Sequence, residues 1–384
     1  MGFIILYIIF FAVLFLEYRN KHKSILSLSL LFVYLVSAIA GLALYLFYPQ
    51  ETFIIDTPSY WPLLFLMVVV FLWIAPYTSM VNRIGVISIS SKKFNSLASV
   101  VGLVYLPITL LLFYNAYNIL TSVDISVFRV DEEYYSYFVG GMFFSLGAWM
   151  AGISFVPQVL FFLSFIYETK AVTKVMLLIA SLSFAALTLC FAGRDGIVYW
   201  IMDSVVLYLL CKDSMSVKAR ALLKKILYVF GIVILLLLLI ITVYRFILSY
   251  IESESLIKPV LDYIGEPIHI FSQSFNMDVE EVRKLDKTSY LTYTFGTFIM
   301  SLWTSYGLIG LFIFTFIHYV LVRSFVVKFN RLHNLYDFLI VFTLFQIPMY
   351  GVFYYRQGLQ QLDLTYVVFI VLCILYKNIR KARV

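Results

Sequence analysis

Long apolar runs separated by short polar stretches dominate the chain. A helix needs about 20 mostly apolar residues to cross a bilayer, with a usual range of about 17–25. The pattern predicts eleven such helices, at residues 2–16, 25–47, 61–80, 98–120, 136–166, 175–192, 197–211, 226–249, 305–322, 338–354 and 364–376. The fifth run is long enough to tilt, or to break near Pro157. We expect an all-α membrane protein of about 10–12 spans that forms a single integral membrane domain over residues 1–384.

Residues 250–304 form the longest stretch between predicted spans, and they make up one long outer loop. Within it, residues 290–303 are apolar, but counting them as a span would place the basic stretches that follow on the outer side. We therefore expect 290–303 to be interfacial or re-entrant. Such a segment is tolerated only where its backbone lies against protein or a wet cavity.

Composition and charge agree with this interpretation and give it a direction. Hydrophobic residues make up 63% of the chain and charged residues 13%, whereas soluble domains average about 45–50% and about 25%. This composition excludes a water-soluble fold, and it excludes nucleic-acid binding as the main function. Alternate connections and the C-terminal tail hold 20 of the 28 basic residues, which makes that face cytoplasmic by the positive-inside rule. The N-terminus is then outside the cytoplasm and the C-terminus within it.

The outer face carries the remaining basic residues, which are Arg129, Arg194, Arg245, Lys258, Arg283, Lys284, Lys287 and Arg356. Arginine is frequent among them, and its planar guanidinium binds phosphate oxygens bidentately. The alternative is ion pairing with acidic residues of the same face, which are also numerous there. For Lys284 and Lys287, beside Asp286, that alternative is favoured. The outer arginines are candidates for anion binding.

The sequence FAGRDGIVYW, residues 191–200, lies where the sixth predicted span turns into the seventh. Glycines flank Arg194 and Asp195, and glycine permits positive φ and close approach of the backbone to a ligand. We expect Arg194 to bind an anion and Asp195 to orient it. The alternative is a tight turn with a self-contained ion pair.

Other outer candidates are an arginine near the end of a span and a polar hairpin. Arg245 ends an apolar run just below the outer surface, where it either faces a cavity or snorkels to headgroups. In YYRQGLQQLD, residues 354–363, Arg356 precedes Gln357 and further amides, which bind sugar hydroxyls well. An ordinary solvated turn is the alternative there.

The long outer loop offers candidates for proton transfer. Tyr263, Glu266 and His269 lie close together in DYIGEPIHIFSQSFN, and either Glu266 or His269 could accept a proton from a hydroxyl. Arg283 follows in the same loop. Arg129 lies beside an acidic cluster in the loop 121–135, where a local ion-pair cluster is the alternative. No Walker A motif, CxxC or HExxH occurs, so we expect no metal site and no cofactor.

With eleven predicted spans, a long outer loop late in the chain, GRDG at an outer hairpin and several outer arginines, the chain resembles the O-antigen polymerase (Wzy-type) family. Members of this family are bacterial oligosaccharide repeat-unit polymerases. The spacing of Arg129 and Gly140, with ten residues between them, matches an arginine motif of such polymerases. A second motif of this kind is missing from the long loop, because Thr294 stands eleven residues after Arg283.

The resemblance implies a glycosyltransferase-C-like fold in the bacterial inner membrane and a metal- and nucleotide-independent reaction. Donor and acceptor would be undecaprenyl-pyrophosphate-linked oligosaccharides, as in O-antigen or capsule biosynthesis. Further partners would be membrane lipid and a chain-length regulator protein. The alternatives are a flippase for lipid-linked oligosaccharides, which is a transporter, and a ligase-like transferase that uses the same lipid donor.

Overall fold

The computed structural model describes residues 1–48, 59–82, 84, 87–122, 138–191, 193–249, 258–275, 297–353 and 360–381. These residues form helices and their connections, without a strand among them. The helices are α1 (Gly2–Asn20), α2 (Ile25–Phe47), α3 (Pro62–Ile74), η2 (Ala75–Tyr77), α4 (Ser91–Ser122), α6 (Met142–Ala151), α7 (Phe155–Ile166), α8 (Ala171–Ser181), α9 (Ser183–Cys190), α10 (Asp195–Cys211), η5 (Lys212–Ser214), α11 (Val217–Ser249), α12 (Lys258–Ser274), α14 (Phe298–Leu332), α15 (Leu335–Tyr350) and α16 (Gln360–Lys381). The predicted all-α fold is confirmed for this part of the chain.

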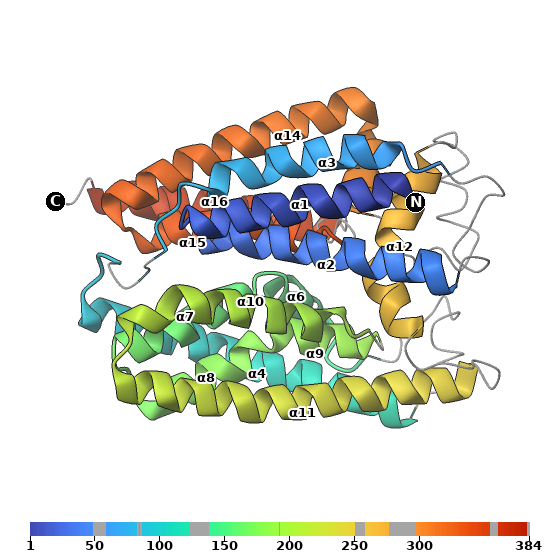
Figure 1. Cartoon of the computed structure of the whole chain (residues 1–384). Coiled ribbons are helices and arrows are strands. Elements are labelled where there is room, and N and C mark those ends of the chain that lie inside the picture. Colours follow the sequence, from blue (N-terminus) through green and yellow to red (C-terminus); the bar gives the residue numbers. More distant parts are fainter. Residues whose placement is uncertain are drawn as a thin grey trace. The chain divides into compact units, whose positions relative to one another are not determined.

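The helices group into two compact units, each built from two separate stretches of the chain. Unit 1 comprises Met1–Asn82 and Ser253–Gln360, and unit 2 comprises Arg83–Glu252 and Gln361–Val384. Unit 1 therefore contains α1–α3, α12, α14 and α15, whereas unit 2 contains α4–α11 and nearly all of α16 (Figure 1).

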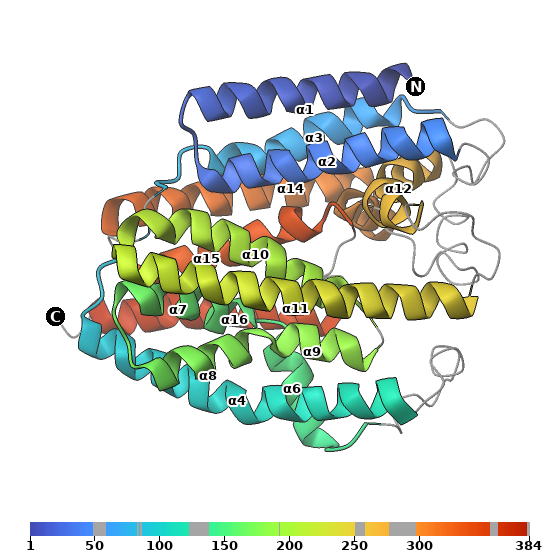
Figure 2. The same cartoon turned by 60° about the horizontal axis from the view of Figure 1, so that its bottom comes forward.

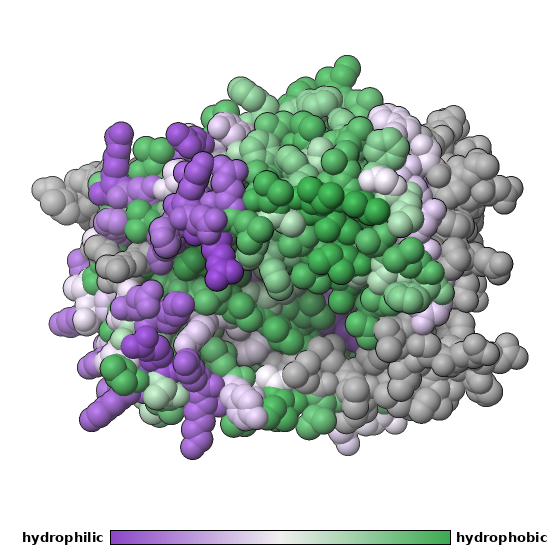
Figure 3. Space-filling model, viewed as in Figure 1, coloured by the Kyte–Doolittle hydropathy of each residue, from purple (hydrophilic) through white to green (hydrophobic). Residues whose placement is uncertain are grey.

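Several helices are long and apolar enough to cross a membrane. Five meet this condition within the described residues, and the bent pair α6 and α7 makes a sixth if it is one span. Three shorter apolar helices lie at Pro62–Tyr77, Leu335–Tyr350 and Leu364–Lys377. On the face seen in Figure 3, hydrophobic residues cover the middle of the region where α1, α3 and α14 lie. The chain is an all-α protein with membrane-spanning character.

The predicted break in the fifth apolar run exists, but it lies before Pro157. Helices α6 and α7 meet at 58° across residues 152–154. Pro157 is then the third residue of α7. The first turn of a helix tolerates proline, because its N–H groups have no partner within the helix.

In unit 1, connections that were predicted to share the cytoplasmic side meet at one end of the bundle. The side chain of Asn82 accepts from the N–H of Ile25 (2.6 Å) and donates to the carbonyl of Lys23 (3.1 Å). Near the end of α14, Asn330 donates to the carbonyl of Ser79 (2.7 Å). The basic residues of the α1–α2 connection therefore lie at the same end as the C-terminal end of α14. Figure 3 shows hydrophilic residues gathered where α1 and α14 end.

Unit 2 repeats this arrangement with its own helices. The Tyr167 hydroxyl at the end of α7 donates to the carbonyl of Ile87 (2.8 Å), and its ring stacks on Phe94 of α4 (4.3 Å between centroids). The lysines at the start of α4 and in the α7–α8 connection therefore lie at one end of unit 2. Within each unit, this is the sorting of charge that the predicted sidedness requires.

The apolar segment 290–303 is described from residue 297 onward. Phe298 begins a short helical stretch that ends at Gly307, where a φ of 70° and a ψ of 178° interrupt α14. Phe298, Ile299, Leu302 and Trp303 of this stretch are buried, whereas residues 305–307 are exposed. The N–H of Phe298 donates to the carbonyl of Gly351 (2.8 Å), and its ring packs on Trp73 of α3. Residues 290–296 lie outside the described residues.

Candidate functional site

The turn between α9 and α10 presents Arg194 and Asp195 at the start of α10. The N–H groups of Phe191 and Gly193 both donate to the carbonyl of Thr188, at 3.0 and 2.7 Å, and so close the end of α9. Arg194 directly precedes α10, and Asp195 is its first residue. Both side chains are half-buried.

The two glycines of this turn, Gly193 and Gly196, allow close packing of the helices. Neither has a positive φ, although glycine permits one. A Cβ on Gly196 would lie 2.5 Å from Thr188 Oγ1 and 2.7 Å from the carbonyl oxygen of Phe184. A Cβ on Gly193 would lie 3.0 Å from Asp195 Oδ1. The glycines thus let α10 begin directly against α9, with the carboxylate of Asp195 beside the backbone of the turn.

The electrostatics of this turn favour an anion. The N-terminal end of a helix carries a partial positive charge, which stabilises carboxylates and phosphates and disfavours cations. Asp195, in the first turn of α10, satisfies this preference. Arg194 adds a cation at the same end. A negatively charged group is therefore the class of ligand that suits this turn.

The end of the loop that contains Arg129 lies next to this turn within unit 2. Phe138, the first described residue after that loop, packs edge to face on Phe191 (5.2 Å between centroids). Asn115 of α4 fixes the following residue with two hydrogen bonds, donating to the carbonyl of Val139 (3.0 Å) and accepting from its N–H (2.6 Å). Arg129 itself lies outside the described residues.

Gly140, the residue that pairs with Arg129 in the arginine motif, has a φ of +109°, and Gly141 has a φ of +49°. Residues with a side chain rarely adopt such φ values, because their Cβ clashes with the backbone. These glycines turn the chain sharply into α6. Among the described residues of this region, Gly140 and Gly141 are the positions where the backbone requires a positive φ.

Below the turn, α10 carries polar side chains into the interior of unit 2. The Gln158 amide of α7 donates to the carbonyl of Trp200 (2.9 Å) and to Ser204 Oγ (2.9 Å). The indole of Trp200 donates to Ser181 Oγ of α8 (2.9 Å). Asp203 is fully buried beside them on the same helix. This network holds α10, and hence Arg194, against α7 and α8.

In unit 1, α12 crosses α2 near its C-terminal end (Figures 1 and 2). The crossing is close because Gly265 lies on the backbone of Ala40 and Gly41. His269, one turn further on, is 0% exposed, and both of its ring nitrogens are engaged. Nε2 contacts the carbonyl of Gly41 (2.7 Å), and Nδ1 contacts the hydroxyl of Tyr60 (2.9 Å).

These contacts define the state of His269. A carbonyl only accepts, so Nε2 carries the proton and Nδ1 accepts from the Tyr60 hydroxyl. Burial lowers the pKa of His269 to about 4 and keeps the ring neutral at pH 7. Glu266, on the same helix, is half-buried, as is Tyr263. Glu266 is therefore the more accessible of the two predicted bases.

The remaining predicted site residues lie largely outside the described part of the chain. Arg245 lies on α11, but its side chain is outside the described part of the chain, and so are Arg283, Arg356 and Gln357. Arg194 and Asp195 belong to unit 2, whereas Tyr263, Glu266 and His269 belong to unit 1. The convergence of these groups on one cavity stays a prediction.

Sequence reasoning missed Asn115, Gln158 and Tyr60, which hold the candidate residues in place. The first two are isolated amides within apolar runs, and a buried amide must find partners. That was the available signal. The partners of Tyr60 and Asn115 could not be found from sequence, since they lie 209 and 24 residues away.

The chain matches no model of a known protein family, and neither the curated proteins nor the solved structures gave a match.

Proposed function

We propose that the protein is a glycosyltransferase of the bacterial inner membrane that polymerises lipid-linked oligosaccharide repeat units at the periplasmic face. The observation that carries this proposal is the α9–α10 turn, where the half-buried Arg194 stands at the positive N-terminal end of α10. Such an arrangement suits a phosphate group at the membrane surface. The turn also lies at the end of its helices away from the basic connection that precedes α8.

The reaction transfers a growing chain from its undecaprenyl pyrophosphate to a new repeat unit. A hydroxyl at the non-reducing end of the new unit attacks the anomeric carbon of the chain. The bond from that carbon to the pyrophosphate oxygen breaks, and undecaprenyl pyrophosphate leaves with the bonding electron pair. The hydroxyl proton passes to a base. The sugar–pyrophosphate bond supplies the driving force, so the reaction needs neither a nucleotide nor a metal.

The arginines stabilise the departing pyrophosphate. Preorganised donors aimed at a developing charge typically contribute about 10²–10³ in rate each. Arg194 is the principal donor, and Asp195 fixes its orientation. The arginines that would join it are Arg129, Arg245 and Arg356.

The proposed base and sugar-binding residues are those that the sequence predicts in the outer segments of the chain. Glu266 is preferred as the base over His269, because Glu266 is partly accessible while both nitrogens of His269 are engaged within the fold. Tyr263 would stack on a sugar ring. Arg283 and Gln357 would bind further hydroxyl or phosphate oxygens.

The proposal includes an architecture of about eleven spans of the glycosyltransferase-C-like type, with a periplasmic N-terminus and a cytoplasmic C-terminus. A chain-length regulator protein would act beside it. The gathering of basic residues at one end of each unit supports this sidedness.

The flippase alternative is less well supported. Many transporters are built from two successive repeats of similar structure. Here the two units interleave along the chain, because unit 2 interrupts unit 1 between Asn82 and Ser253. A ligase-like transferase would share the donor site and differ only in its acceptor.

A deletion strain distinguishes these functions. Loss of a polymerase leaves surface lipid capped by a single repeat unit, and the chain restores long polymer when it is expressed again. Loss of a flippase or a ligase leaves no repeat unit on the surface lipid, and that result would contradict the proposal.

A further inference from the structure

The start of α11 concentrates positive charge on an exposed surface of unit 2. Lys218, Lys224 and Lys225 are exposed, and Arg220 is half-buried. Lys212 precedes them in η5. Asp213 is the sole acidic residue between Cys211 and Tyr228, and the first turn of α11 contains none. Because the N-terminal end of a helix is itself positive, these cations add to the dipole, and the segment favours anions.

Exposed apolar side chains alternate with these cations. Val217 is 75% exposed, Leu222 50% and Tyr228 71%. On a helix, residues three, four and seven apart share a face, so Leu222 lies between Lys218 and Lys225. The distance along the axis from Lys218 to Lys225 is about 10 Å. The cations therefore form a row with apolar side chains between them, and they do not converge on one point.

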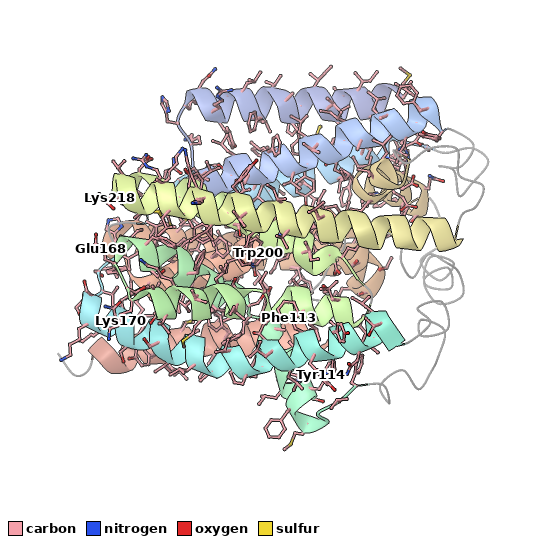
Figure 4. The ribbon with its side chains drawn as sticks, turned by 90° about the horizontal axis from the view of Figure 1, so that it is seen from below. Phe113, Tyr114, Glu168, Lys170, Trp200 and Lys218 are labelled. Atoms are coloured by element: carbon pink, nitrogen blue, oxygen red, sulfur yellow. The ribbon has the colours of Figure 1, made fainter. Side chains whose placement is uncertain are left out.

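We propose that this segment, residues 212–228, binds the phosphate groups of anionic phospholipids. A row of cations matches a layer of headgroups better than it matches one free phosphate. The apolar side chains between them fit the acyl region beneath that layer, and lysine stems lie along such a surface with their ammonium groups in the headgroups. Figure 4 shows Lys218 at the end of unit 2 that also carries Glu168 and Lys170. The proposal is independent of the proposed enzymatic function.

The test is native mass spectrometry of the purified full chain in a neutral detergent, titrated with dioleoyl phosphatidylglycerol. A basic residue near an anionic surface contributes about fivefold in affinity. Replacing Lys218, Lys224 and Lys225 by glutamine should therefore weaken binding of the lipid by about 10²-fold. Binding of dioleoyl phosphatidylcholine should not change. All three side chains are exposed, so the variant is expected to fold, and its helical circular dichroism serves as the check.

A matched variant removes the same charge elsewhere on unit 2. Lys92, Lys93 and Lys170 are exposed lysines outside the segment, and their replacement by glutamine leaves the row of cations intact, so it should weaken binding of the lipid by clearly less than about 10²-fold. Equal losses in both variants would mean that net charge alone governs binding and would overturn the proposal. Displacement of the bound phosphatidylglycerol by millimolar inorganic phosphate would overturn the proposal as well, because the segment would then bind a free anion.

Discussion

Gly265→Ala tests the helix crossing that positions α12 and its two candidate bases. A Cβ at this position would lie 2.5 Å from the carbonyl carbon of Ala40 and 2.8 Å from its oxygen. These are backbone atoms of α2, so no side chain can rotate away to make room. The helices must therefore move apart by roughly 1 Å before ordinary van der Waals contact is restored.

The cost follows from that displacement. Overpacking of this kind typically costs about 1–3 kcal/mol. Separation of the helices also lengthens the 2.7 Å hydrogen bond from His269 Nε2 to the carbonyl of Gly41. Loss of this bond leaves two buried polar groups without a partner, which costs about 1–3 kcal/mol of unfolding free energy. Alanine regains about 1 kcal/mol of helix propensity over glycine. The net destabilisation is expected to be about 2–4 kcal/mol.

The assay is equilibrium unfolding of the purified protein in mixed micelles, monitored by circular dichroism. Gly231→Ala on α11 is the matched control, because a Cβ on Gly231 would have no neighbouring atom within 4 Å. It should be neutral or stabilise by up to about 1 kcal/mol. If Gly265→Ala were as stable as the wild type, or if both variants lost stability equally, the close crossing of α2 and α12 would be refuted.

Three further predictions concern stability and topology. The pKa of His269 in the folded state, about 4, lies below the ordinary value of 6.5, so the folded protein resists protonation of this ring. Its contribution to the free energy of unfolding is therefore complete above pH 6.5 and falls by about 3 kcal/mol as the pH is lowered towards 4. His269→Gln should flatten this part of the stability profile, and an unchanged slope would contradict the assignment. Asn115→Ala removes both hydrogen bonds to Val139 and should cost about 2–4 kcal/mol of unfolding free energy, whereas Asn95→Ala on the same helix should cost less than 1 kcal/mol. Reporter fusions after Lys225 and Arg380 should report a cytoplasmic location and fusions near Asp278 a periplasmic one, and a cytoplasmic signal at Asp278 would overturn the predicted sidedness.

The helices could be predicted from the sequence because apolar runs of sufficient length have few other solutions in a membrane. Their breaks were harder to place. Pro157 marked the region of the bend between α6 and α7, but the proline lies inside the first turn of α7, where it causes no disruption. The break falls instead at residues 152–154, where α6 ends.

The candidate site was predictable in its residue types and less so in their surroundings. The GRDG sequence indicated a tight turn at a helix end, but close packing of Gly196 on α9 could be seen only once the helices were placed. His269 lies in a stretch rich in polar residues and so looked accessible. Its burial depends on Gly41, which lies 228 residues earlier in the chain. Long-range contacts of this kind leave no local signal.

The central claim is that Arg194 stabilises a departing pyrophosphate during polymerisation. The most direct test supplies purified protein with synthetic undecaprenyl-pyrophosphate-linked repeat units, without added nucleotide or metal, and measures polymer length on gels. The wild type should form a ladder of products. Arg194→Ala and Arg194→Lys should both be slower by about 10²–10³, because lysine keeps the charge but loses the bidentate fork. Asp195→Asn should be less affected. Full activity in Arg194→Ala, or no polymer from the wild type, would contradict the claim.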